Sequence, residues 1–155
     1  MNRKYILAID QGTTGSTALI LNFTNPKSPK IIAKHTVTFK QYYPKPGWVE
    51  HNLEDIYNSV LESISSVIKQ AQQKDTYFTT NKIISIGITN QRETLCSFYK
   101  QNATPAYHAI VWQCRRSSNI CDKLKTQTLE PLIRKKTGLL LDPYFSGTKI
   151  LWIMT

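Results

Sequence analysis

The segment "ILAIDQGTTGSTALIL", residues 6–21, constrains the fold more than any other part of the chain. Two apolar runs, which predict strands over residues 5–9 and 18–23, flank a short polar loop with two glycines and several hydroxyl side chains. Because this loop leads into a strand rather than a helix, the segment is not the start of a dinucleotide-binding unit, and it contains neither GxGxxG nor GxxxxGK[ST]. The sequence therefore predicts a β-hairpin that carries Asp10 at the lip of a buried strand.

The segments that follow the hairpin predict an α/β fold. A strand at residues 31–39 completes a three-stranded meander, and two prolines and a glycine make residues 40–51 a loop. Residues 53–73 repeat apolar side chains, Tyr57 and Ile64 among them, at spacings of three and four, which predicts an amphipathic helix. Residues 82–89 form a near-continuous apolar run, typical of a strand covered on both faces. Further strands are expected at residues 94–99 and 108–112, and helices at 117–127, 129–137 and 146–155.

Composition narrows the class of protein. With 155 residues, 41% hydrophobic and 19% charged, the chain is expected to form one globular domain with its own core. The net charge of +10 comes from scattered Lys and Arg, including Arg115 and Arg116, which favours solvated faces over a nucleic-acid site. No apolar run approaches a membrane span, and the N-terminus lacks the pattern of a signal peptide, so a cytoplasmic location is expected. The three cysteines have no CxxC spacing and are expected to be reduced thiols.

The polar loop has the chemistry of a phosphate site. Two glycines let backbone N–H groups approach an anion closely, and the hydroxyls of Thr13, Thr14 and Ser16 add donors. Asp10 makes sense beside a phosphate only if a cation lies between them, most simply Mg²⁺ with its water shell. The alternative is a plain hairpin in which glycine and threonine serve turn geometry. Spacing alone supports the two interpretations about equally.

Five segments together resemble the FGGY carbohydrate kinases, and among these the glycerol kinases. They are "DQGTTGST" (10–17), "YPKPGWVEH" (43–51), "GITNQRET" (87–94), "AIVWQCRR" (109–116) and "GLLLDPYFSGTKILWI" (138–153). The resemblance covers essentially the whole chain. It implies ATP-dependent phosphorylation of glycerol to sn-glycerol 3-phosphate. It also implies the ribonuclease H-like fold of the actin-like ATPases, and the predicted order of elements resembles that fold as well. In this family the chain would correspond to the N-terminal portion of the first domain.

The same resemblance implies roles for individual residues. It assigns nucleotide phosphates to Thr13, Thr14, Gly15 and Thr17, the Mg²⁺ shell to Asp10, and glycerol to Arg92, Glu93, Trp112 and Tyr144. Two positions depart from the family pattern, because Gly15 replaces a serine and Thr17 an arginine. A threonine cannot supply the long cationic contact that arginine makes to phosphate.

The proposed glycerol residues also make chemical sense by themselves. A small triol needs an acceptor, here Glu93, and donors, here the Arg92 guanidinium, backed by apolar faces. Trp112 and Tyr144 can supply those faces. Without the family, the residue pattern favours a surface Arg–Glu pair and two core aromatic residues.

The resemblance places the catalytic base beyond Thr155, together with a second phosphate loop and the adenosine-binding domain. Neither Asp75, Asp122 nor Asp142 lies in a motif that recommends it as the base. The chain is therefore expected to be inactive alone. It is either part of a kinase completed from elsewhere or a non-catalytic remnant with a binding surface. A ribonuclease H-like nuclease is a weaker alternative, because only Glu93 joins Asp10 as a candidate metal ligand.

The last predicted helix is apolar over residues 150–154, which is too much for one helix face. These side chains are expected to lie partly exposed. They would then promote association with a further copy or with the missing part of the kinase.

Overall fold

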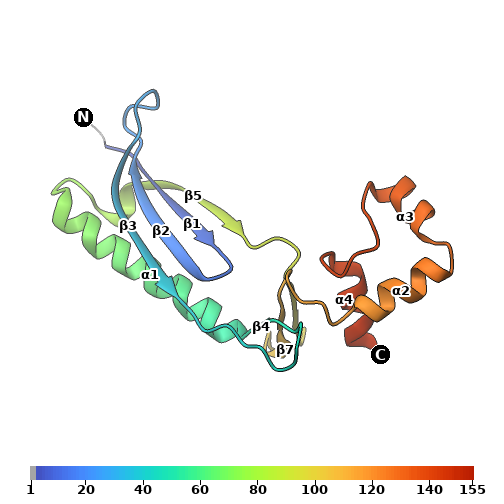
Figure 1. Ribbon diagram of the computed structural model, residues 1–155. Helices are drawn as coiled ribbons and strands as arrows, with labels where there is room; N and C mark the ends of the chain where they lie inside the picture. The colour runs from blue at the N-terminus through green and yellow to red at the C-terminus, as the bar shows by residue number, and fades with distance from the viewer. Residues whose placement is uncertain (1–2) are drawn as a thin grey trace. The chain divides into compact units, whose positions relative to one another are not determined.

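The computed structural model describes residues 3–155, and these form two compact units (Figure 1). The first unit contains the described residues up to Lys40 together with Glu54–Gln91, and the second contains Gln41–Leu53 and Arg92–Thr155. The strands pair in two separate sheets, one in each unit.

The first unit is built on a four-stranded sheet. Its strands are β1 (Tyr5–Gln11), β2 (Gly15–Asn22), β3 (Lys30–Thr38) and β5 (Ile83–Asn90), in the order β3-β2-β1-β5. β1, β2 and β3 form the antiparallel meander predicted from the sequence, and β5 pairs parallel to β1. Asp10 and Thr89 are partners in the parallel register. The strand predicted at residues 82–89 therefore ends at the same edge of the sheet as Asp10.

Helix α1 (Leu53–Lys74) packs on one face of this sheet (Figure 1). Alternate residues of β1 point into the core and meet Val67 and Ala71. The predicted helix face is wrong at Tyr57, which is 63% exposed, whereas Ser59 and Ser63 are buried. The two serines donate to helix carbonyls at 2.7 and 2.8 Å, so small polar side chains can face the sheet without unpaired hydroxyls.

Strand β5 differs from its prediction. A strand covered on both faces was expected, but Ile84, Ile86 and Ile88 are 54%, 59% and 73% exposed. Ile86 and Ile88 pair with the core residues Leu7 and Ile9 and thus lie on the α1 side of the sheet. The core beneath α1 is formed with residues of β1, β2 and β3, and from β5 only Ile83 packs against it.

The second unit has a small antiparallel sheet and three helices. The sheet has the order β4-β7-β6, with β4 (Glu50–His51), β6 (Leu95–Phe98) and β7 (Pro105–Ile110). Strand β4 lies in a segment that was predicted to be a loop. The prediction missed it because a strand of two residues is too short to show an alternating pattern. Helices α2 (Ser118–Thr126), α3 (Glu130–Thr137) and α4 (Ser146–Met154) lie close to their predicted bounds. The helices of residues 3–155 include none that is long and apolar enough to cross a membrane.

The apolar residues of α4 are partly exposed, as expected. Ile150, Leu151 and Met154 are exposed. Trp152 does not belong to this exposed group, because its ring packs edge-on against Trp48 at 5.2 Å and against Tyr107 at 5.8 Å.

Candidate functional site

The glycine-rich hairpin is tighter than the sequence indicated. β1 and β2 extend to Gln11 and Gly15, so Asp10 and Thr17 are paired across the ladder and only residues 12–14 form the loop. The N–H of Gly12 donates to the carbonyl of Gly15 at 2.9 Å and closes the turn. Thr14 lies exposed at the tip, and Thr13 is half-buried beside it. Both predicted phosphate contacts therefore sit on a short backbone turn.

Gly15 has a structural reason to be glycine. A Cβ atom at this position would lie 2.6 Å from the carbonyl oxygen of Val37 in β3, a distance that no real side chain tolerates. The departure from serine at this position thus matches a close approach of β2 and β3 in this chain.

The hydroxyl groups of Ser16 and Thr17, next to the loop, lie on opposite faces of the sheet and have different hydrogen-bond partners. Thr17 bonds to Thr36 across the β2–β3 ladder, with 2.8 Å between the two Oγ1 atoms. Ser16 was expected to add a donor to the loop, but it is buried on the opposite face and bonds to Ser59 at 2.8 Å. Strict alternation along β2 explains this outcome, because Ser16 and Thr17 must point to opposite faces of the sheet.

Asp10 is the one predicted metal-contacting residue, and its side chain is exposed at the end of β1. Within residues 3–155 there is no cluster of three or more His, Cys, Asp or Glu side chains that could hold a metal ion. Mg²⁺ commonly keeps several waters and uses one or two carboxylates together with substrate phosphates. A single exposed carboxylate beside a glycine-rich turn fits that mode of binding.

The four predicted glycerol residues all lie in the second unit. Arg92 and Glu93 occupy a turn before β6, Trp112 follows β7, and Tyr144 precedes α4. The rings of Trp112 and Tyr144 meet at 5.8 Å between centroids, with 64° between their planes. The backbone N–H of Trp112 donates to the Thr94 hydroxyl at 3.3 Å, directly after Glu93 in the chain. Trp112 is thus linked both to Tyr144 and to the turn that carries Glu93.

The carboxylate of Glu93 is anchored at the first turn of α4. Its Oε2 atom accepts from the backbone N–H of Ser146 at 3.0 Å and from the Ser146 hydroxyl at 2.7 Å. A helix N-terminus favours a negative charge. Both hydrogen bonds found for this carboxylate among residues 3–155 fall on Oε2, which leaves Oε1 as an acceptor for a ligand.

Arg92 is exposed, and the ion pairs of the described residues include none between Arg92 and Glu93. The surface Arg–Glu pair that the residue pattern favoured is therefore not formed. Ser146 and Lys149 both hydrogen-bond to Glu93, and neither was identified from the sequence as a site residue. The one sequence feature that could have indicated them is their position, two and five residues after Tyr144.

Arg116 is a second departure from the sequence prediction. It was grouped with solvated cations, yet its side chain is fully buried and its Nη2 atom donates to Glu50 at 2.6 Å. The guanidinium lies 3.9 Å from the Trp48 ring centroid and 4.7 Å from that of Trp152. Burial alone would raise the pKa of Glu50, but the hydrogen bond and charge of Arg116 outweigh it and the pKa is lowered.

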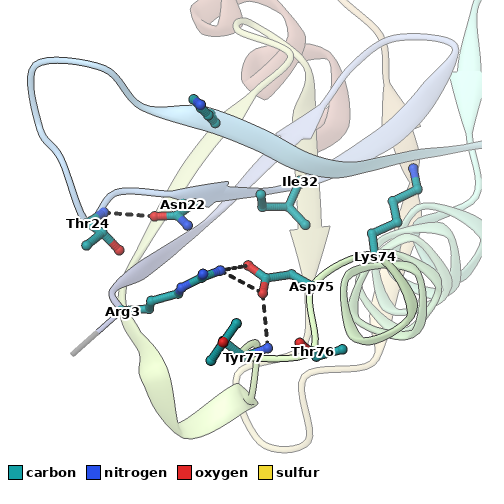
Figure 2. Close-up of a pocket in the computed structure, with 9 residues that line it drawn as sticks. Arg3, Asn22, Thr24, Ile32, Lys74, Asp75, Thr76 and Tyr77 are labelled. Atoms are coloured by element: carbon teal, nitrogen blue, oxygen red, sulfur yellow. Dashed lines mark hydrogen bonds and ion pairs between the residues drawn. The ribbon is translucent and has the colours of Figure 1, made fainter. Parts of the chain in front are cut away.

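A cavity of about 830 Å³ lies elsewhere in the first unit, at the end of β1 away from the hairpin (Figure 2). Arg3, Lys30 and Lys74 line it together with Asp75. Arg3 donates to both oxygens of Asp75, at 2.9 and 3.0 Å, and the Tyr5 hydroxyl donates at 2.8 Å (Figure 2 shows the Arg3 bonds). None of the predicted site residues lines this cavity.

Comparison with known proteins agrees with the sequence and the fold. The profile of the FGGY family of carbohydrate kinases, N-terminal domain, matches residues 5–155. Glycerol kinases of Thermus thermophilus and Geobacillus kaustophilus are each 50% identical over 97% of this chain. The chain spans 29% of the length of these relatives.

Solved structures show the same fold. The glycerol kinase of Plasmodium falciparum, crystallised with ADP, superposes with a TM-score of 0.86 at 31% identity, over 98% of this chain and 29% of that one. A gluconate kinase from Lactobacillus acidophilus gives a TM-score of 0.84 at 22% identity, over 99% of this chain and 28% of its own. The predicted actin-like fold class is confirmed, and the chain belongs to the FGGY family of carbohydrate kinases.

Proposed function

We propose that this chain supplies the first phosphate loop and the alcohol-binding residues of a glycerol kinase. The reaction transfers the γ-phosphoryl group of ATP to glycerol and yields sn-glycerol 3-phosphate. The chain is the N-terminal portion of the first domain, and the second, adenosine-binding domain lies outside it. One observation carries the proposal: Glu93 is anchored through Oε2 alone, in a turn linked to the Trp112–Tyr144 ring pair.

Each of these side chains has a role toward a triol. Oε1 of Glu93 accepts a hydrogen bond from a hydroxyl group of the ligand, and the exposed Arg92 guanidinium donates to neighbouring hydroxyl oxygens. The rings of Trp112 and Tyr144 cover the C–H edge of the ligand. The relatives that are 50% identical are named glycerol kinases, which supports glycerol as the alcohol.

The hairpin serves the nucleotide. The backbone of Thr13, Thr14 and Gly15 would approach the phosphates, and Asp10 would hold a Mg²⁺ ion through its water shell. That ion would supply charge neutralisation at the phosphate oxygens. Thr17 already shares its hydroxyl with Thr36 and offers at most a short neutral contact. The ADP in the Plasmodium falciparum structure belongs to that protein and supports an adenine nucleotide here.

The chain needs a further segment for catalysis. Asp75 is engaged by Arg3 and Tyr5, and Asp142 pairs with Arg115 at 3.0 Å, so neither is placed as a general base. We propose that the remaining part of the kinase supplies the base. A cytoplasmic location is part of this proposal.

Two experiments test this function. In a coupled assay with ATP, Mg²⁺ and glycerol, the 155-residue chain alone is expected to stay at background. A chimera in which residues 5–155 replace the matching segment of the Geobacillus kaustophilus enzyme is expected to turn over glycerol. Glu93→Gln should abolish that turnover, and Glu62→Gln, on the exposed face of α1, should leave it unchanged.

The outcomes separate the alternatives. A folded chimera without activity would favour the non-catalytic remnant, whereas clear turnover by the chain alone would refute the need for a further segment. A nuclease would require several carboxylates converging on two metal ions, and no such group occurs among residues 3–155.

A further inference from the structure

Lys149 lies in the middle of α4, and its side chain is fully buried, which is unusual for a lysine. A buried ammonium group needs hydrogen-bond partners, because it has lost its water. The residue lies three positions after Ser146, so both side chains extend from the same side of α4. Sequence reasoning gave Lys149 no role beyond membership of a resembling segment.

The partners of this ammonium group are two backbone carbonyls. Nζ donates to the carbonyl oxygen of Glu93 at 2.8 Å and to the carbonyl oxygen of Tyr144. These two residues come from distant parts of the chain, and both were predicted to contact glycerol. One side chain therefore ties together the backbone of the proposed acceptor and that of one covering ring.

The conformation of Glu93 explains why such a tie matters. Its φ is +61°, in the left-handed region that non-glycine residues rarely adopt without support. Helix α4 supplies that support twice, because Lys149 holds the carbonyl of Glu93 and Ser146 holds its Oε2. A relaxed backbone at Glu93 would move its carboxylate out of reach of Ser146.

We propose that Lys149 is a positioning residue for the alcohol substrate, which fixes Glu93 and Tyr144 so that the carboxylate and the ring address the same ligand. The inference rests on the proposed function and deepens it. Lys149 does not touch glycerol itself. Its removal should therefore change the geometry of Glu93 as well as the affinity for glycerol.

A purely structural role is the competing explanation, and Thr148 offers a matched control. Thr148 is buried in the same helix turn and bonds to Ser117, with 3.0 Å between the hydroxyl oxygens. It has no hydrogen bond to Glu93 or Tyr144 among those found in residues 3–155. Thr148→Val thus weakens the packing of α4 and leaves the ammonium contacts in place.

The experiment uses NMR on the isotopically labelled 155-residue chain with glycerol as the probe. The first readout is the intraresidue NOE between the amide proton and Hα of Glu93, which is strong when φ is positive. The second is the dissociation constant from glycerol-induced shifts of the Trp112 indole signal. Lys149→Met should lose the strong NOE and bind glycerol about tenfold more weakly. Thr148→Val and the exposed Lys135→Met should retain both properties.

The possible failures are distinguishable. A strong Glu93 NOE and unchanged glycerol affinity in Lys149→Met would overturn the positioning role, as would equal weakening in Thr148→Val. If Lys149→Met does not fold, Lys149→Gln replaces it and is judged by the same two readouts. If glycerol shifts no signal of the unaltered chain, the result counts against the proposed function, and the Glu93 NOE still decides the positioning role.

Discussion

The buried pair of Arg116 and Glu50 gives the sharpest stability prediction. The two side chains are 0% and 7% exposed, and Glu50 also accepts from Tyr107 and His108 at 3.1 Å each. Arg116→Met keeps an apolar side chain of similar length against Trp48 and removes the charge. Glu50 is then left as a buried carboxylate without its cation.

The expected cost is large. Removing one partner of a buried ion pair destabilises a protein by about 3–5 kcal/mol, mainly because the other charge stays buried and uncompensated. Arg115→Met is the matched control, because Arg115 pairs with Asp142 at 3.0 Å with both side chains exposed by a third or more. An exposed pair contributes about 0–1 kcal/mol, so this neighbouring substitution should change little.

Tryptophan fluorescence during urea unfolding is the assay. The chain has three tryptophans, Trp48, Trp112 and Trp152, and all three lie in the second unit, where the ion pair lies. Their emission therefore follows that unit specifically. A double variant, Glu50→Leu with Arg116→Met, should recover much of the lost stability, since no buried charge remains.

The pH dependence has a defined sign. The pKa of Glu50 is lowered in the folded state, so the stabilisation from the pair is complete above the ordinary carboxyl range and is lost as the pH falls through the folded pKa. The difference between Arg116→Met and the unaltered chain should therefore shrink in acid. A loss below about 1 kcal/mol at pH 7, equal to that of Arg115→Met, would refute the buried-pair interpretation.

Other predictions follow from the fold and the burial of single side chains. Gly15→Ala should destabilise the first unit and raise amide exchange in β2 and β3, because its Cβ meets the Val37 carbonyl; unchanged exchange would contradict the close approach. Val67→Asp should unfold that unit in circular dichroism, whereas the exposed Tyr57→Asp should be tolerated. Burial lowers the pKa of His51 from 6.5 to about 4, so the stability of the second unit should fall as pH drops from about 6.5 to 4, and His51→Gln should flatten that slope.

The sequence predicted the meander, α1 and the position of Asp10 at the same sheet edge as the end of the strand at residues 82–89, because each depends on local periodicity and on the rule for a parallel crossover. It did not predict that Ser59 and Ser63 face the sheet, since their hydroxyls are satisfied within the helix itself. The exposure of Ile88 was also missed, because periodicity indicates which residues can be buried and not whether anything covers them.

In the candidate site, too, some residues were predicted from the sequence and others were missed. Glu93, Trp112 and Tyr144 were named from motifs, and the structure places all three in the second unit. The supporting residues were missed, because the burial of Lys149 and Arg116 depends on contacts between segments far apart in the chain. A lone lysine or arginine in a sequence is most often solvated, and no local pattern distinguishes the exception.

The exposure of β5 has a consequence for the solubility of the isolated chain. Residues 83–88, "IISIGI", carry no charge and no proline, and they have high β-propensity. Within the described residues, β5 is the end strand of its sheet. Six-residue segments of this composition can stack into cross-β fibrils when they stand open at an edge. A polypeptide that covers β5 would therefore keep the chain soluble. The rate of fibril nucleation, compared with and without such a polypeptide, would report how much of the chain has β5 uncovered.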